Sequence, residues 1–344
     1  MQLKKILTIA LLGIASAASA QTADPSTDPH IDPQVRVFLK KLNDAGKGQP
    51  PIYKLPGSGP ADALTALQNQ TDVDMSGIEV TEKTITEDGV TVPLHIMRPV
   101  GVSGVLPVIV FYHGGVWLVG NYENHKRFVR DLVVGTQAVA VFVDYTLIPV
   151  AKFPVQINQA YAALKWVSEH GSEINVDPSR IAIAGNSVGG NMAAAIALMD
   201  KDKHGPALRM ELLLYPAVGA DFTTGSYKMY GQNRFLTTDF MKYGYDVYAP
   251  NMETRKNRYC VPMAATIEEA KGLPYTLIQV AENDPLRDEG EAYGRKLREA
   301  GVNCTVTRYN GLIHDFQVLN AINTVPAVQT SIKQAVDELK NALK

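Results

Sequence analysis

The spacing of hydrophobic and polar positions changes several times along the chain, and each change predicts an element. Polar and apolar residues alternate over 78–85 and 90–97 around an Asp88-Gly89 turn, which predicts an antiparallel hairpin. Short runs rich in apolar and β-branched residues predict further strands at 105–112, 138–145, 181–184, 210–215, 275–280 and 304–309. Apolar positions three or four residues apart predict helices at 33–42, 124–132, 155–169, 189–199, 289–300 and 325–343.

The order of these elements predicts the fold class. Strands and helices alternate from residue 105 onward, and several strands are apolar on both faces, so helices must cover both sides of the sheet. We therefore predict an α/β fold with a mostly parallel central sheet. Residues 21–75 form an N-terminal extension, with a loop-like stretch at 48–62, and residues 76–344 form the main domain with an insertion at about 221–260.

Composition and charge exclude several classes of protein. Hydrophobic residues make up 46% of the 344, which is ample for a core and excludes a disordered chain. The 33 Lys and Arg nearly balance the 35 Asp and Glu, and they form no dense run. A nucleic acid partner is therefore not expected.

The first twenty residues resemble a cleaved signal peptide. Lys4 and Lys5 precede an apolar run at 6–14, and Ala18-Ser19-Ala20 forms a small-residue cleavage site before Gln21. The run is too short to span a bilayer, which takes about 20 residues. We expect export to the periplasm or the medium after cleavage between Ala20 and Gln21, and no stable membrane insertion. The alternative is a buried N-terminal helix.

The chain has two cysteines, Cys260 and Cys304. An oxidising compartment permits a disulfide between them, but a core of this size does not need one. Two separate half-buried thiols are the alternative, and we favour this alternative over the disulfide. Their spacing suits no zinc site, and we expect no metal and no cofactor.

The pentapeptide Gly185-Asn186-Ser187-Val188-Gly189 lies between a predicted strand and a predicted helix. G-x-S-x-G is a weak pattern alone, but in a strand–turn–helix it is typical of an elbow that lifts the serine hydroxyl clear of the sheet. Gly185 and Gly189 remove the Cβ atoms that would collide in so sharp a turn. The alternative is a glycine-rich turn with an idle serine.

Serine needs a base, and the base needs an orienting acid. Of the seven histidines, His314 lies just after the last predicted strand, where a base would emerge at the edge of the sheet. Asp284 directly follows the strand at 275–280 and is the predicted acid. Asp288 is its rival, although we expect it to cap the next helix. Asp315 adjoins His314 and is expected to point elsewhere.

A second motif, His113-Gly114-Gly115, ends the predicted strand at 105–112. A glycine-rich loop there can direct backbone N–H groups at the carbonyl oxygen that Ser187 would attack. We expect His113 itself to brace the loop through hydrogen bonds.

With these residues the chain resembles the hormone-sensitive-lipase-like branch of the α/β-hydrolases, bacterial carboxylesterase family IV. The resemblance covers about residues 75–342 and rests on the two motifs above together with Asp144-Tyr145-Thr146-Leu147-Ile148-Pro149, Phe153-Pro154, Asp284–Glu289 and His314-Asp315-Phe316. It implies the α/β-hydrolase fold, a helical cap and a Ser187–Asp284–His314 triad. It also implies short acyl esters as substrates and an oxyanion hole formed by the N–H groups of Gly115, Val116 and Val188.

The chain departs from the family pattern at several positions. Val116 stands where the family has a third glycine, and Asn186-Ser187-Val188 stands where it usually has Asp-Ser-Ala. Thr146 and Val150 replace a common Arg and Glu. We expect these changes to alter substrate shape more than the reaction, and the Val116 methyls to crowd a bulky alcohol group.

The insertion is rich in aromatic residues, eight of which lie within 222–248: Phe222, Tyr227, Tyr230, Phe235, Phe240, Tyr243, Tyr245 and Tyr248. They either line an apolar pocket as a lid or attach the insertion to the body.

Together these features predict an exported serine carboxylesterase that takes a small-molecule ester and could form a homodimer. The rivals are a serine peptidase or amidase of the same fold and a non-catalytic ligand receptor on this scaffold.

Overall fold

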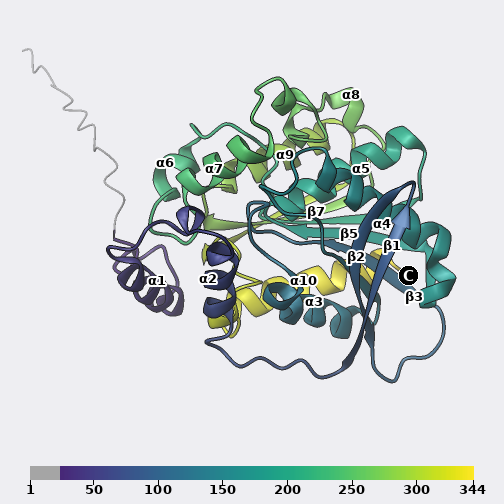
Figure 1. Ribbon diagram of the computed structural model, residues 1–344, viewed down its shortest axis with the longest axis horizontal. Coiled ribbons are helices and arrows are strands. Elements are labelled where there is room, and N and C mark those ends of the chain that lie inside the picture. Colours follow the sequence, from purple (N-terminus) through teal and green to yellow (C-terminus); the bar gives the residue numbers. More distant parts are fainter. Residues whose placement is uncertain (1–23) are drawn as a thin grey trace, which may run out of the picture.

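The computed structural model describes residues 24–344, and an eight-stranded twisted sheet forms its centre (Figure 1). The strands are β1 (Ile78–Glu87), β2 (Val90–Pro99), β3 (Leu106–Tyr112), β4 (Val139–Val143), β5 (Val176–Asn186), β6 (Leu208–Leu214), β7 (Tyr275–Asn283) and β8 (Cys304–Ile313). Their order in space is β1-β2-β4-β3-β5-β6-β7-β8. The pairs β1–β2 and β2–β4 are antiparallel and the other neighbours are parallel, which confirms the predicted sheet.

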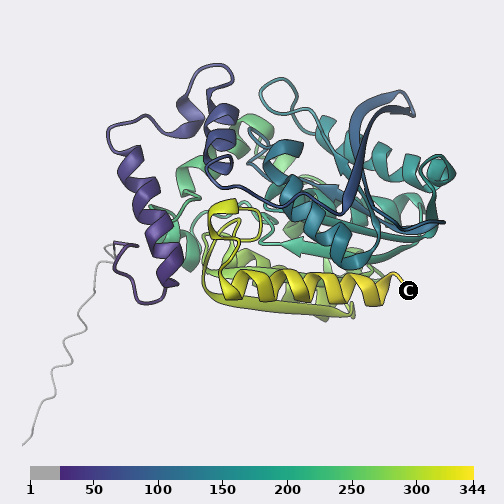
Figure 2. The same cartoon turned by 90° about the horizontal axis from the view of Figure 1, so that it is seen from below.

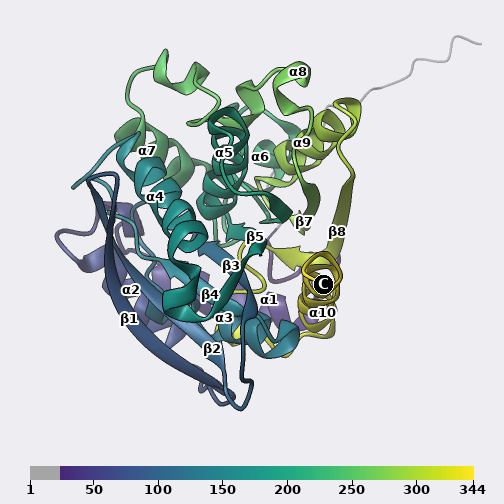
Figure 3. The same ribbon diagram turned by 90° about the vertical axis from the view of Figure 1, so that its right-hand side faces the viewer.

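Helices cover both faces of this sheet (Figure 3). One face carries α4 (Val155–His170), α5 (Val188–Lys203) and α9 (Arg287–Glu299), and the other carries α3 (Tyr122–Thr136) and α10 (Pro326–Ala342). Strand β3 explains why: Val108 and Val110 belong to one hydrophobic core, whereas Ile109 and Phe111 belong to the core on the opposite face. A strand buried on both faces reads as a continuous apolar run.

The N-terminal segment packs against the insertion. It contains α1 (Pro33–Gly46), η1 (Ile52–Lys54) and α2 (Gly59–Gln68), and these lie beside α6 (Gly225–Tyr230) and α7 (Thr238–Tyr248) at one end of the molecule (Figures 1 and 2). The Tyr53 ring stacks on Phe240 and Tyr243, with centroids 5.5 and 5.1 Å apart. A buried ion pair joins Arg234 to Asp28 at 2.7 Å. Two segments distant in sequence thus share one interface.

Several element bounds differ from those predicted. Helix α2 begins at Gly59, inside a stretch expected to be loop, and α3 begins two residues early at Tyr122. Strand β5 begins at Val176 rather than 181, because it pairs with β3 there although residues 177–180 lie near the surface. Strand β8 reaches Ile313 because its end pairs with Asn283 of β7. In each strand, pairing with a neighbour extends beyond the apolar run.

The remaining elements are short helices in the connections. They are η2 (Gly171–Ile174), η3 (Thr254–Lys256), η4 (Pro262–Ala264), α8 (Ile267–Ala270) and η5 (Asn320–Ile322).

Both cysteines are buried free thiols, so the alternative of two separate thiols holds in this structure. Burial raises the pKa of Cys260 and of Cys304 to about 12, which keeps both protonated and unreactive at neutral pH.

Among residues 24–344, no helix combines the length and apolar character that a bilayer span requires. The segment predicted as a signal peptide, with its cleavage site, lies outside the described residues.

Candidate active site

Ser187 occupies a sharp turn between β5 and α5. Its φ of +56° is one that side-chain-bearing residues rarely adopt. A hydrogen bond to the end of β6 fixes this turn, because the Ser187 N–H donates to the carbonyl of Leu214 at 2.9 Å. A Cβ on Gly185 would lie 2.2 Å from the Gly189 oxygen, and one on Gly189 would lie 2.0 Å from the Tyr112 oxygen. Only glycine fits at these two positions, as the sequence predicted.

The structure brings Ser187, His314 and Asp284 into one hydrogen-bonded row. His314 Nε2 lies 2.9 Å from Ser187 Oγ, and His314 Nδ1 lies 2.8 Å from Asp284 Oδ2. The other oxygen of Asp284 accepts from the Leu286 N–H at 2.8 Å, which fixes the carboxylate. All three residues are at most 1% exposed. The carboxyl ends of strands β5, β7 and β8, which are distant in sequence, therefore meet at one edge of the sheet.

The charges around His314 favour its protonated form. Burial lowers the pKa of His314, but the nearby carboxylates of Asp284 and Asp315 outweigh this and raise it overall. A proton taken from Ser187 would thus be stabilised on the imidazole.

Asp288 does not share this arrangement. It was expected to cap the next helix, but the N-cap of α9 is Leu286 and Asp288 lies in the first turn. Its carboxylate instead accepts the Ser226 N–H of α6 at 2.8 Å and the Arg287 Nε–H at 3.0 Å. Because α6 packs against α9, this carboxylate binds Ser226 instead of capping the helix. Asp288 therefore attaches the insertion to the segment that follows β7.

The loop after β3 places backbone N–H groups beside the elbow. In the described part of the chain, the N–H groups of Gly115, Val116 and Val188 have no hydrogen-bond acceptor, so they remain available to a ligand. The Gly114 N–H differs, because it donates to Asn186 Oδ1 at 2.9 Å. Gly115 has a φ of +112°, and a Cβ there would lie 2.1 Å from the Val119 oxygen.

His113 lies behind this loop rather than in the hydrogen-bonded row of Ser187, His314 and Asp284. Burial lowers its pKa to about 3, so the ring is neutral. Its Nδ1 donates to the Gly114 carbonyl at 2.7 Å, and the Tyr145 hydroxyl donates to the His113 carbonyl at 2.8 Å. This geometry fits the bracing role expected from the sequence.

Val116 and Trp117 connect the loop to the insertion. Both have a φ of +55°, which is unusual for a β-branched or bulky residue. Trp117 stacks on Tyr248 of α7 with centroids 4.0 Å apart. Val116 Cγ1 lies 2.2 Å from where a Cβ on Gly244 of α7 would be. The missing side chain at Gly244 therefore makes room for Val116, and packing against α7 holds the loop in its strained conformation.

The aromatic residues of the insertion act largely as attachment points. Tyr245 and Tyr248 pack against Trp117, Phe240 and Tyr243 pack against Tyr53, and Phe235 packs against Phe38. Of the two interpretations of the cluster, these contacts favour attachment, to the main domain through Trp117 and to the N-terminal segment through Tyr53 and Phe38.

Asp315 was expected to point away from the site, and this prediction is wrong. Its φ of +59° turns the side chain back, so that Oδ1 lies 3.8 Å from His314 Nε2 and 2.9 Å from Asn186 Nδ2. The signal in the sequence that could have revealed this contact was Asn186, which stands where the family usually has aspartate.

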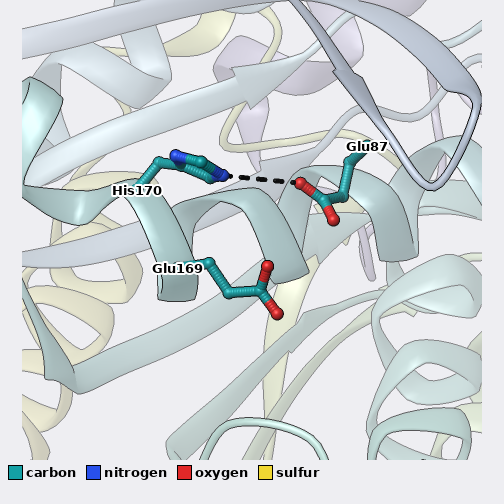
Figure 4. A group of neighbouring side chains, drawn as sticks. All are labelled: Glu87, Glu169 and His170. Atoms are coloured by element: carbon teal, nitrogen blue, oxygen red, sulfur yellow. Dashed lines mark ion pairs between the residues drawn. The ribbon is translucent and has the colours of Figure 1, made fainter.

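Outside this site, Glu87, Glu169 and His170 lie close enough to hold a cation (Figure 4). The Lys165 ammonium, however, lies 2.6 Å from Glu87 and 3.7 Å from Glu169, and Asp88 also binds it at 2.8 Å. Hydrogen bonds with Asp88 and Glu87 raise the pKa of Lys165. The lysine already balances these carboxylates, and the cluster indicates no metal site.

Known proteins similar to this chain show the family to which it belongs. A family model described as the alpha/beta hydrolase fold matches residues 109–318. Carboxylesterase NlhH of Mycobacterium tuberculosis is 35% identical over 319 residues, covering 92% of this chain and 97% of that protein. The crystal structure of a thermostable esterase from Pseudomonas putida superposes with a TM-score of 0.90 at 49% identity, covering 92% of this chain and 99% of the other. An esterase of Rhizomucor miehei has a TM-score of 0.84 at 33% identity, with 91% and 96% covered.

These relatives and structural neighbours are carboxylesterases and esterases, which confirms the resemblance drawn from the motifs. The chain belongs to the α/β-hydrolase family, in its hormone-sensitive-lipase-like branch, and is a carboxylic ester hydrolase.

Proposed function

We propose that this protein is an exported serine carboxylesterase that hydrolyses short acyl esters through an acyl-enzyme intermediate. The observation that carries the proposal is the row of hydrogen bonds from Ser187 through His314 to Asp284, with distances of 2.9 and 2.8 Å. A serine hydroxyl becomes nucleophilic when a positioned base takes its proton, and this row supplies both the base and its orienting acid.

The reaction then follows from the roles of the three groups. Ser187 Oγ attacks the ester carbonyl while His314 Nε2 takes the proton, and the N–H groups of Gly115, Val116 and Val188 bind the developing oxyanion. His314 returns the proton to the departing alcohol. Water, activated by the same histidine, cleaves the acyl-enzyme and frees Ser187. Asp284 keeps the imidazole in the tautomer with Nδ1 protonated throughout.

Preference for short acyl chains is supported by the packing around the serine. Helix α7 lies directly on the loop that would bind the oxyanion, through Trp117 and Val116. Ser187 itself is 1% exposed. A long acyl chain would have to separate these contacts, whereas an acetyl group displaces less.

The test is hydrolysis of p-nitrophenyl esters from C2 to C12, with Ser187→Ala as the control. We expect the highest kcat/KM at the short end and no activity above background in the control. Cleavage of amides at rates comparable to esters would favour the peptidase or amidase. Tight binding of esters without turnover would favour the receptor.

Export makes a separate prediction. If the segment at 1–20 is a signal peptide, protein recovered from the periplasm or medium of its native host should begin at Gln21. Mass spectrometry of the intact chain measures this directly. Retention of Met1 on exported protein would contradict the prediction.

The packing of Val116 against α7 predicts a size-dependent effect on turnover. Gly244→Ala would place a methyl 2.2 Å from Val116 Cγ1 and 3.2 Å from the Val116 oxygen, and the short branched valine cannot swing aside. The oxyanion loop must then shift, and we expect kcat to fall about tenfold or more, in line with overpacking costs of about 1–3 kcal/mol. Adding Val116→Gly should restore most of the loss.

The matched control is Gly46→Ala, at the end of helix α1, where no atom lies within 4 Å of the new Cβ. It should leave kcat unchanged. If Gly244→Ala were equally harmless, or if Val116→Gly gave no rescue, the loop would not depend on α7. The ratio of tert-butyl to ethyl acetate hydrolysis in Val116→Gly tests in addition whether the second valine methyl crowds the alcohol.

A further inference from the structure

We propose that Asn186 and Asp315 act as a pair of positioning residues, which together hold a second carboxylate beside the reacting nitrogen of His314. This inference rests on the proposed function, since it assigns a role around the same base. The two residues lie 129 positions apart in sequence and meet at the carboxyl end of β5.

The Asn186 amide is oriented by its neighbours. It is completely buried, its Oδ1 accepts the Gly114 N–H at 2.9 Å, and its Nδ2 donates to Asp315 Oδ1 at 2.9 Å. The second Nδ2 hydrogen is directed at His125 Nε2, and the two nitrogens lie 3.4 Å apart. His125 Nδ1 must carry its proton, because it lies 3.0 Å from the Asn121 carbonyl, so its Nε2 can only accept. The amide oxygen thus meets a donor, and the amide nitrogen meets two acceptors.

An aspartate at position 186, the residue usual in the family, would not fit these partners. A carboxylate only accepts, so it would face the Asp315 carboxylate at about the distance of the present hydrogen bond, together with the lone pair of His125. Two carboxylates that close cannot both ionise without a large cost. Asn186 is therefore the neutral partner that Asp315 requires.

Asp315 is held in place by its backbone as well as by Asn186. Its φ of +59° is one that aspartate tolerates better than most residues, and its carbonyl accepts the N–H groups of Val318 and Leu319 at 2.8 and 2.9 Å. The carboxylate is thereby fixed with Oδ1 3.8 Å from His314 Nε2. That distance exceeds a hydrogen bond, so Asp315 acts on the imidazole through charge and leaves Nε2 to Ser187.

Charged and titratable groups surround His314 on each side. Asp284 contacts Nδ1, Asp315 faces Nε2, and the Tyr215 ring of the β6 end packs edge-on with a centroid separation of 5.0 Å. Burial raises the pKa of Tyr215, so it carries no charge, and burial lowers that of His125, which is neutral. Arg127 of α3 is directed to the carbonyls of Gln317 and Val318. The imidazolium formed during catalysis therefore lies between two carboxylates.

The pair also connects three parts of the site. Asn186 adjoins the nucleophile, its oxygen holds the Gly114 end of the oxyanion loop, and its nitrogen holds the carboxylate beside the base. A change at this residue should alter kcat rather than KM, because none of the three contacts depends on the ester.

The experiment compares Asn186→Asp, Asp315→Asn and the exchanged double variant, each by the pH dependence of kcat/KM for p-nitrophenyl acetate. Removing the Asp315 charge lowers the pKa of His314, and the base works only when neutral. The acid limb of Asp315→Asn should therefore move to lower pH, by about 0.5 unit or more, while kcat falls about threefold to thirtyfold. Asn186→Asp should lose about thirtyfold or more at neutral pH.

The double variant carries one amide and one carboxylate again, in exchanged places. We expect it to be at least about tenfold more active than Asn186→Asp, with its acid limb moved back toward that of the wild type. Asp177→Asn, at the opposite end of β5, is the control for loss of a carboxylate remote from His314 and should leave the acid limb unchanged. Circular dichroism checks that each variant folds.

An unmoved acid limb in Asp315→Asn, or a double variant no better than Asn186→Asp, would overturn the pair. If Asn186→Asp does not fold, the acid limbs of Asp315→Asn and of the double variant still decide. Ser187→Ala separates the two proposals. If it abolishes hydrolysis and the acid limb of Asp315→Asn stays fixed, only the pair is wrong. If it retains full activity, the proposed function and the pair both fall.

Discussion

Ser187→Ala and His314→Ala are each expected to lower kcat for short acyl esters by at least about 1,000-fold while leaving the fold intact. Under the proposed mechanism, Ser187→Ala removes the nucleophile, and His314→Ala removes the group 2.9 Å from its oxygen that would take the proton. The two losses should not multiply in the double variant, because both groups act in one step. Steady-state kinetics of the three variants measures this.

The fold should tolerate both changes for a physical reason. The turn at Ser187 is held by backbone hydrogen bonds to the Leu214 carbonyl and from Ala217, which do not involve the hydroxyl. Alanine fits the same φ about as well as serine. A near-normal melting temperature together with full activity in either variant would refute the assignment of that residue.

Asp284→Asn is the second large effect, and it should cost about 100-fold or more in kcat, less than either change above. The new amide cannot present an acceptor to His314 Nδ1 and also keep an acceptor toward the Leu286 N–H, because only one of its two polar atoms accepts. The imidazole then loses its orientation or takes the other tautomer, in which Nε2 is protonated and cannot act as the base.

The matched comparison is Asp288→Asn, four residues away. Its carboxylate binds Ser226 of α6 and Arg287 and does not touch His314, and one amide oxygen still accepts the Ser226 N–H. We expect a loss of less than about tenfold in kcat and a measurable fall in melting temperature, since the contact fastens the insertion. Equal losses of kcat in the two variants would contradict the choice of acid.

Much of the fold could be predicted because its cause is local. The apolar run at 105–112 alternates between two cores, so its residues must lie between two layers of helices. The elbow at 185–189 could be predicted as well, since its glycines meet atoms of their own turn and of the adjoining strand. Each feature can therefore be recognised in a short stretch of the sequence.

The sequence also determined which side chains would be candidates for the site. Strand ends in a parallel sheet meet at one edge, so a histidine after the last strand and an aspartate after its neighbour must approach the elbow. The structure brings Ser187, Asp284 and His314 together there. The order of the elements alone was enough to predict that Asp284 lies beside His314, although capping was the wrong explanation of Asp288.

What only the tertiary structure decided depends on contacts between residues distant in sequence. The orientation of Asp315 follows from one positive φ and from the Asn186 amide, and the room for Val116 follows from a glycine on α7, 128 positions later. The spacing of hydrophobic and polar residues does not reveal such pairs, because each residue alone is compatible with many partners. The sequence by itself determined the sheet, the elbow and the candidate side chains of the site, since these follow from local pattern and strand order. Tertiary packing alone decided which neighbours hold them in place.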